Sequence, residues 1–251
     1  GTESLAEKYQ NIYIAKVVKC TDIEGTHLHL CEIDAGIRNS EFSTLESGLI
    51  QVVCGAPNVR AGILVAWLAP GAIVPSTFGT ENFQLSVRKL RGYESYGMIA
   101  GPDELGFGNE HKYIAEIAPG LAKSGDAFSS VFGLDDLIID IENKSLTHRP
   151  DTFGIIGFAR EVAGILGLKF NELKIYQGDF RSQTEVFSRK NTDLSIEIAD
   201  PKLCPRYSCV VLEQSDFTKE PAPEVPDNRP LTKDSIFLYK AGMRPVSQIV
   251  D

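Results

Sequence analysis

Short runs of apolar and β-branched residues, each ended by glycine, proline or asparagine, fill the first hundred residues and limit the folds open to this chain. The candidate strands are residues 12–19, 26–34, 48–53, 63–68 and 97–100. Within the second run the apolar alternation changes phase at Leu30–Cys31, which predicts a bulge or a sharp bend. Five short strands with a bend are typical of a five-stranded Greek-key barrel of the OB type, although periodicity alone leaves other small barrels open. We predict this barrel for residues 8–132, with a frayed start over residues 1–10, in which Leu5 and Tyr9 could alternatively pack as one helical turn.

A different pattern begins after the predicted barrel. Residues 133–180 contain a candidate strand and then apolar residues at helical spacing from Ile155 to Leu166. Further apolar positions lie off that stripe, so we expect a helix that is buried on most sides. We assign Asp151 as its N-cap, because the carboxylate can accept the free amide hydrogens of the first turn. Three glycines lower the helix propensity, and we expect close backbone packing around Gly154, Gly157 and Gly164.

The last part of the chain reads as the start of another module. Residues 192–251 hold candidate strands at 194–198 and 204–212, then a proline-rich stretch and a helix beginning at Ser235. The sequence stops within an apolar run, so we interpret this part as truncated. The predicted fold class is therefore α+β and multi-module: a five-stranded OB-type β-barrel, a small strand–helix packing module over 133–180, and a truncated α+β segment.

One basic cluster stands out in an acidic protein. The formal net charge is -9 and the pI is near 5.0, which argues against a surface that binds nucleic acid all over. Arg88, Lys89 and Arg91 lie together on a predicted strand or strand-edge loop. Arginine forks onto phosphate and lysine adds a point charge, so we predict RNA contacts here, to single-stranded or structured RNA. A merely solvated face is the alternative.

Neighbouring residues extend this candidate surface. Tyr93, with Tyr96 and Phe83, could stack on bases or could pack in the barrel. Asn58 and Arg60 follow the third strand and could form a binding loop at the barrel mouth, or serve only as turn residues. We also assign Ser95 to the RNA-binding set. It is not a nucleophile, since the spacing of its glycines differs from a Gly-x-Ser-x-Gly elbow and no histidine is near in sequence.

Other chemistries find little support. Five cysteines, with no Cys-x-x-Cys pair, argue against a disulfide framework or a zinc ribbon and indicate a reducing cytoplasm. His27 and His29 supply too few ligands for a metal, so we predict none. The sequence has neither a phosphate-binding Gly-x-x-x-x-Gly-Lys loop nor a dinucleotide fingerprint, and we predict no catalytic residue. No apolar run approaches the ~20 residues needed to span a bilayer.

Three groups of motifs, in chain order, resemble a known family. The motifs are Val53–Val59, Lys89–Met98 and Glu104–Gly106 in the barrel, then Leu146–Asp151 with Gly157–Ala163, and finally Cys204–Tyr207 with Ala241–Val246. The first group resembles the tRNA-binding domain that several synthetase-associated RNA binders share. All three together resemble the N-terminal part of the beta chain of bacterial-type phenylalanyl-tRNA synthetases. The chain departs from that family at Thr21–Thr26, where members often carry a His-Pro-x-Ala-Asp turn.

The resemblance implies a function and partners. It implies a non-catalytic, tRNA-binding part of an alpha2-beta2 ligase in the cytoplasm, followed over residues 192–251 by the start of a domain that hydrolyses mischarged tyrosyl-tRNA. Arg206 and Arg244 would then border the editing pocket. The whole enzyme would charge tRNA with phenylalanine using ATP and magnesium, with the aminoacylation site on the alpha subunit, and this part alone would hold no cofactor and be inactive. The alternative is a scaffold in which the OB module docks protein and has little RNA affinity.

Overall fold

A computed structural model describes residues 1–36, 45, 47–108, 111–171, 197–205, 207 and 230–243. By its internal contacts the chain divides into two compact units, residues 1–140 with 214–251 and residues 141–213. The boundaries of the three predicted modules stay predictions. No helix in the described part of the chain is long and apolar enough to cross a membrane.

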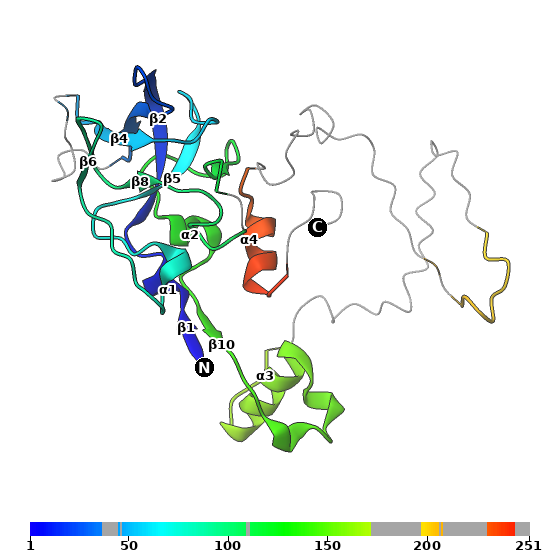
Figure 1. The fold of residues 1–251 in the computed structure, drawn as a ribbon. Coiled ribbons are helices and arrows are strands. Elements are labelled where there is room, and N and C mark those ends of the chain that lie inside the picture. Colours follow the sequence, from blue (N-terminus) through cyan, green and yellow to red (C-terminus); the bar gives the residue numbers. More distant parts are fainter. Residues whose placement is uncertain are drawn as a thin grey trace. The chain divides into compact units, whose positions relative to one another are not determined.

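The first unit is built on a nearly closed, five-stranded antiparallel barrel, which confirms the predicted OB-type fold class (Figure 1). Its strands are β2 (Ile12–Asp22), β3 (His29–Asp34), β4 (Ile50–Cys54), β5 (Leu64–Leu68) and β8 (Met98–Ile99). They pair in the order β4-β3-β2-β5-β8, and the short β9 (Glu116–Ile117) pairs with the other end of β5. Each of the five barrel strands overlaps a run that the sequence predicts.

The long strand β2 bends the sheet into a barrel. Its first half pairs with β5, its second half pairs with β3, and Lys16 has a partner on both sides. The pairing with β3 shifts by one residue between Val17 and Lys19, so the bulge lies at Val18. The prediction of a bulge at Leu30–Cys31 was wrong by one strand. Leu30 and Cys31 pair in regular register with Thr21 and Cys20, and the phase change there reflects a half-buried Leu30 next to a buried Cys31.

Alternation along β2 and β5 sends side chains into two separate cores. Ala15 and Val17 join Val65 and Trp67 inside the barrel, while Ile12 and Ile14 join Ala66 and Leu68 on the other face. The second core is covered by helix α2 (Phe128–Phe132) and by helix α1 (Leu5–Lys8) with Tyr9. Both faces of β5 and of the first half of β2 are therefore largely buried.

The N-terminus is ordered, so the predicted fraying is wrong and the alternative of a helical turn packed through Leu5 and Tyr9 is confirmed. Strand β1 (Thr2–Ser4) pairs with β10 (Leu137–Ile139), and Ser4 caps α1 by accepting from the amide of Glu7. Tyr9 is 3% exposed and its hydroxyl donates to the carbonyl oxygen of Leu105 at 2.8 Å. Sequence alone does not show this pairing, because the two strands lie more than 130 residues apart.

Helix α4 (Lys233–Lys240) packs on the same unit. Leu231 forms a parallel bridge with Ile117, and Ile236 is fully buried in the core outside the barrel. Lys240 Nζ donates to the carbonyl oxygen of Gly133 at 2.6 Å and to Asp136 at 2.7 Å. The predicted helix near Ser235 is thus confirmed, and it extends the barrel unit.

The second unit corrects two expectations about its helix. After the 3-10 turns η2 (Lys144–Leu146) and η3 (Pro150–Thr152), helix α3 (Gly154–Ile165) begins at N-cap Phe153, which supplies no side-chain cap. Asp151 instead forms an ion pair with Arg149, so its assignment as the N-cap was wrong. The helix is also more exposed than predicted. Ile155 is 84% exposed, and among the helix residues that the structure describes only Gly157 is buried.

Among the helix glycines, Gly157 fits the expected close packing. A Cβ there would meet the backbone oxygen of Asp151, whereas one at Gly164 would have no atom within 4 Å. The predicted strands at 194–198 and 204–212, and the stretch before them, lie largely outside the described residues. Of the remaining elements, η1 (Pro75–Thr77) lies in the barrel unit, and β6 (Arg88–Leu90) and β7 (Tyr93–Ser95) form a separate hairpin there.

Candidate nucleic-acid interface

The predicted basic cluster lies on the β6–β7 hairpin. Its register pairs Arg88 with Ser95, Lys89 with Glu94 and Leu90 with Tyr93. The two-residue loop is Arg91–Gly92, with φ of 49° and 95°. Two positive φ values are what a type I′ turn requires, and that turn matches the twist of a tight hairpin. Arg91 therefore lies at the tip of the hairpin.

Strand alternation divides the cations between the two faces of the hairpin. Arg88 lies on the same face as Leu90 and Tyr93, while Lys89 lies on the opposite face beside Glu94. The three charges thus surround the hairpin and do not form one flat patch. None of them forms an ion pair with a carboxylate in the described part of the chain, and all three residues are exposed.

The face with Arg88 also carries exposed apolar and aromatic surface. The Arg88 guanidinium carbon lies 5.4 Å from the ring centroid of Phe83, a cation–π contact. Phe83, Leu90 and Tyr93 are 42%, 41% and 40% exposed. A guanidinium over one ring, with a second ring nearby on the same ribbon face, provides flat surfaces on which a base can stack.

Ser95 fixes the hairpin to the barrel. It is 3% exposed, its Oγ accepts from the amide of Val53 at 3.0 Å, and it donates to the carbonyl oxygen of Gly97 at 3.0 Å. The side-chain amide of Gln51 donates to the carbonyl oxygen of Glu94 at 2.8 Å. These contacts join β4 to β7 and hold the hairpin at a defined position on the barrel.

Tyr96 belongs to the same anchor. Its ring packs half-buried against the core inside the barrel, its hydroxyl donates to Glu94 at 3.0 Å, and Trp67 Nε1 donates to its carbonyl oxygen at 2.9 Å. The hydrogen bond to Glu94 raises the pKa of the Tyr96 hydroxyl above its ordinary value. Tyr96 therefore packs in the barrel, whereas Tyr93 and Phe83 present their rings to solvent.

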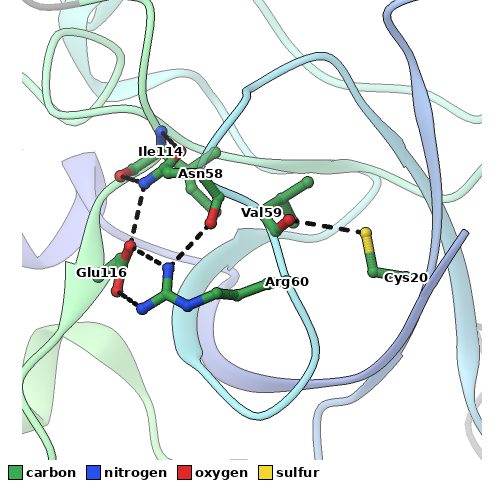
Figure 2. A network of polar contacts seen from close by, with 6 residues as sticks. All are labelled: Cys20, Asn58, Val59, Arg60, Ile114 and Glu116. Atoms are coloured by element: carbon green, nitrogen blue, oxygen red, sulfur yellow. Dashed lines mark hydrogen bonds and ion pairs between the residues drawn. The ribbon is translucent and has the colours of Figure 1, made fainter. Parts of the chain in front are cut away.

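Asn58 and Arg60 form a second polar network, in the turn between β4 and β5 (Figure 2). The Asn58 side chain bonds both backbone groups of Ile114, donating to the carbonyl oxygen at 3.1 Å and accepting from the amide at 3.0 Å. It also donates to Glu116 at 3.2 Å. Arg60 forms a two-pronged pair with the same carboxylate at 2.7 and 2.9 Å. This network fastens the turn to β9.

The charge of Arg60 is matched within the protein. Its hydrogen bonds to Glu116 raise the pKa of the guanidinium, and the side chain remains 59% exposed. Sequence reasoning missed Glu116, because nothing in its local sequence indicates a partner 56 residues earlier. In the predicted loop site, the Asn58 side chain therefore bonds the backbone of Ile114, and the Arg60 side chain forms an ion pair with Glu116.

Comparison with known proteins gives the same assignment as the resemblance. A family model described as a putative tRNA binding domain matches residues 12–126. A phenylalanine–tRNA ligase beta subunit from Streptococcus agalactiae is 34% identical over 259 residues, covering all of this chain and 28% of its own length. One from Desulfotalea psychrophila is 36% identical over 224 residues, covering 89% of this chain and 23% of its own length. The chain is homologous to the N-terminal part of the phenylalanine–tRNA ligase beta subunit. It spans about a quarter of the length of these relatives.

Two residues predicted from this beta-subunit resemblance, Arg206 and Arg244, lie outside the described residues. The histidine pair is partly engaged: His29 Nδ1 lies 2.8 Å from Asp22 Oδ1. In the described part of the chain, no group of three or more His, Cys, Asp or Glu side chains is placed to hold a metal ion.

Proposed function

We propose that this chain is the tRNA-binding, non-catalytic part of a phenylalanine–tRNA ligase beta subunit, and that the β6–β7 hairpin makes the RNA contact. The observation that carries the proposal is the hairpin itself. It presents Arg88, Lys89 and Arg91 without carboxylate partners in the described residues, beside the exposed rings of Phe83 and Tyr93. The putative tRNA binding domain matched over residues 12–126 contains this hairpin and supports the proposal.

The conformation of Arg91 is an independent argument. A non-glycine residue at positive φ is strained by roughly 1–3 kcal/mol, and asparagine or aspartate tolerates that region better than arginine. An arginine at the tip thus weakens the hairpin, and no ion pair of Arg91 within the described residues offsets that cost. The arginine places an exposed positive charge at the tip of the hairpin, where it can bind a phosphate group. Phosphate binding would compensate for the strain.

The proposed site divides into contacting and positioning residues. Arg88 and Tyr93 supply guanidinium and aromatic surface on one face, and Lys89 and Arg91 supply charge for phosphates on the other face and at the tip. Ser95 acts by holding the hairpin on β4, since its hydroxyl is buried. Asn58 and Arg60 shape the neighbouring turn, and Arg60 would reach RNA by exchanging Glu116 for phosphate.

We further infer the activity of the whole enzyme from its relatives. The parent ligase would charge tRNA with phenylalanine in the cytoplasm, using ATP and magnesium at a site on the alpha subunit of an alpha2-beta2 assembly. Residues 192–251 would open its editing domain, with Arg206 and Arg244 at the border of the pocket. This part alone would bind tRNA without catalysis.

Salt dependence of RNA binding tests the proposal. We would titrate the chain with tRNA at several salt concentrations, comparing Arg91→Asn with Lys16→Gln, which removes one exposed charge from β2. Each lost phosphate contact should reduce the slope of log affinity against log salt by about 0.7–0.9. Arg91→Asn should reduce the slope and weaken binding at equal or higher fold stability, because asparagine suits the turn. Lys16→Gln should change the slope little.

A scaffold function is the second candidate, and one observation favours it. Val87, just before the hairpin, and Leu90 within it are 44% and 41% exposed in a chain of net charge -9, and another protein could cover this apolar surface. Absence of tRNA binding at low salt, or binding that ignores salt, would replace the RNA proposal with this one. If Arg91→Asn and the parent chain have equal slopes of log affinity against log salt, the RNA contact does not lie at the tip of the hairpin.

A further inference from the structure

Two free thiols face each other across the β2–β3 pair. Cys20 and Cys31 are direct partners in the register, and their Sγ atoms lie 3.9 Å apart. Cys31 is fully buried inside the barrel, whereas Cys20 is half-buried and lies beyond the bulge of β2. One sulfur of the pair is therefore open to small solutes and the other is protected.

The geometry of the pair suits a covalent bond. Directly opposed residues in an antiparallel sheet have Cα atoms about 4.5–5.5 Å apart, within the range of about 4.4–6.8 Å found for disulfides. The sulfur atoms need to approach from 3.9 Å to roughly 2.05 Å, which rotation about the side-chain bonds supplies. The backbone pairing of β2 with β3 can remain as it is.

The exposed member of the pair also touches the polar turn. Cys20 Sγ donates to the carbonyl oxygen of Val59 at 3.7 Å, and Val59 lies between Asn58 and Arg60 (Figure 2). Turning Cys20 toward Cys31 would withdraw the thiol from this carbonyl. The state of the two sulfurs is thus connected to the turn that is fastened to β9.

We propose that Cys20 and Cys31 form a reversible redox-modification site, in which a peroxide converts the two thiols into a cross-strand disulfide. The Cys20 thiolate attacks one peroxide oxygen, the O–O bond breaks, and a sulfenic acid and hydroxide form. Cys31, as its thiolate, then attacks Cys20 Sγ, the S–O bond breaks, and hydroxide leaves with the proton that the thiol gave up. Overall two thiols lose two electrons and two protons while one hydrogen peroxide becomes two waters.

The surroundings set the character of this site. Burial raises the pKa of the Cys20 thiol, partly offset by the hydrogen bond from Cys31, and burial also raises the pKa of Cys31. Both thiols are therefore mostly protonated at neutral pH, and the first step is slow. Once Cys20 is oxidised, the attack of Cys31 on its sulfur is intramolecular and needs no diffusion. The disulfide therefore forms faster than Cys20 is oxidised further. The site responds to sustained peroxide more than to brief exposure.

Peptide mapping of the peroxide-treated full chain tests the proposal. Trypsin releases one peptide, residues 20–38, that holds both cysteines, and a glutamate-specific protease then separates Cys20 from Cys31 by cutting after Glu24. We expect peptides 20–24 and 25–32 to remain joined, two hydrogens lighter than their sum, and to separate on reduction. Two of the five thiols should become unreactive in the unfolded, unreduced protein.

Two variants sharpen the result. Cys20→Ser should lower the yield of joined peptides at least tenfold, while Cys54→Ala, which removes the other buried thiol of the barrel, should leave it unchanged. Joined peptides that contain Cys54 or Cys204, or stable sulfinic acid at Cys20 without a disulfide, would overturn the proposal. If a variant does not fold, the peptide map of the parent chain is sufficient to test the proposal.

Discussion

Replacing Asn58 by alanine should unfold the barrel at markedly lower denaturant. The change removes two hydrogen bonds to the backbone of Ile114 and one to Glu116. Ile114 is 3% exposed, so its amide and carbonyl groups would lose a partner that water replaces poorly. A buried polar group left without a partner costs about 1–3 kcal/mol. Because Asn58 is itself half-buried and some water can enter, we expect a loss of about 2–4 kcal/mol.

Trp67 provides the assay. It is the only tryptophan in the sequence and is fully buried in β5, so its fluorescence should report the unfolding of the barrel. With a urea dependence of about 1–3 kcal/mol per molar, the expected loss moves the midpoint down by roughly 1–2 M. Arg60→Ala is the matched control, because it removes the exposed partner of Glu116 from the same turn and should change stability by less than about 1 kcal/mol.

The comparison between the two variants carries the test. If Asn58→Ala shifts the midpoint no further than Arg60→Ala, the backbone contacts of the amide do not hold the turn, and our account of this network is wrong. A large shift for both variants would instead assign the stability to the ion pair with Glu116.

Two further predictions rest on single contacts. Gly164→Ala should stabilise α3 by about 1 kcal/mol, whereas Gly157→Ala should destabilise it by at least as much, because the added Cβ meets the backbone of Asp151. The rate of tryptic cleavage within the helix measures both effects. Equal effects of the two variants would contradict the close packing at Gly157. Burial raises the pKa of Glu104 above its ordinary value of 4.5, so the folded state binds that proton more tightly and stability falls as pH rises above 4.5. Glu104→Gln can still accept from Gly101 and should be more stable than the parent at pH 7, with the difference shrinking toward pH 4; no gain at pH 7 in urea unfolding would refute it.

The strands of the barrel could be predicted because each is a local pattern. Alternating or continuous apolar runs mark β5 to within one residue and β4 to within two, and they mark the start of β2, which runs three residues further than predicted. The bulge could not be located from the phase change at Leu30–Cys31, because these residues pair in regular register and the extra residue, Val18, lies in the strand opposite. The strand pairing of β1 with β10 could not be predicted, since it joins segments far apart in sequence.

The candidate site divides in the same way. The basic residues of the hairpin are visible as a cluster in the sequence, but their division between two faces depends on the register with β7. Asn58 reads as an ordinary turn residue until its partners at Ile114 and Glu116 are known. Helix α3 appeared buried because an apolar stripe predicts contact without saying which surface provides it.

The return of residues 230–243 to the barrel bears on how this module can be prepared. Leu231 pairs with Ile117 of β9, Ile236 fills the core outside the barrel, and the Tyr239 ring centroid lies 5.3 Å from that of Phe107. A shortened protein that stops at the end of β10 would uncover these apolar contacts and lose the clasp between Lys240 and Asp136. Such a piece should aggregate more readily than the full chain. Connecting helix α4 to the end of β10 through a flexible linker should restore these contacts in a shortened protein.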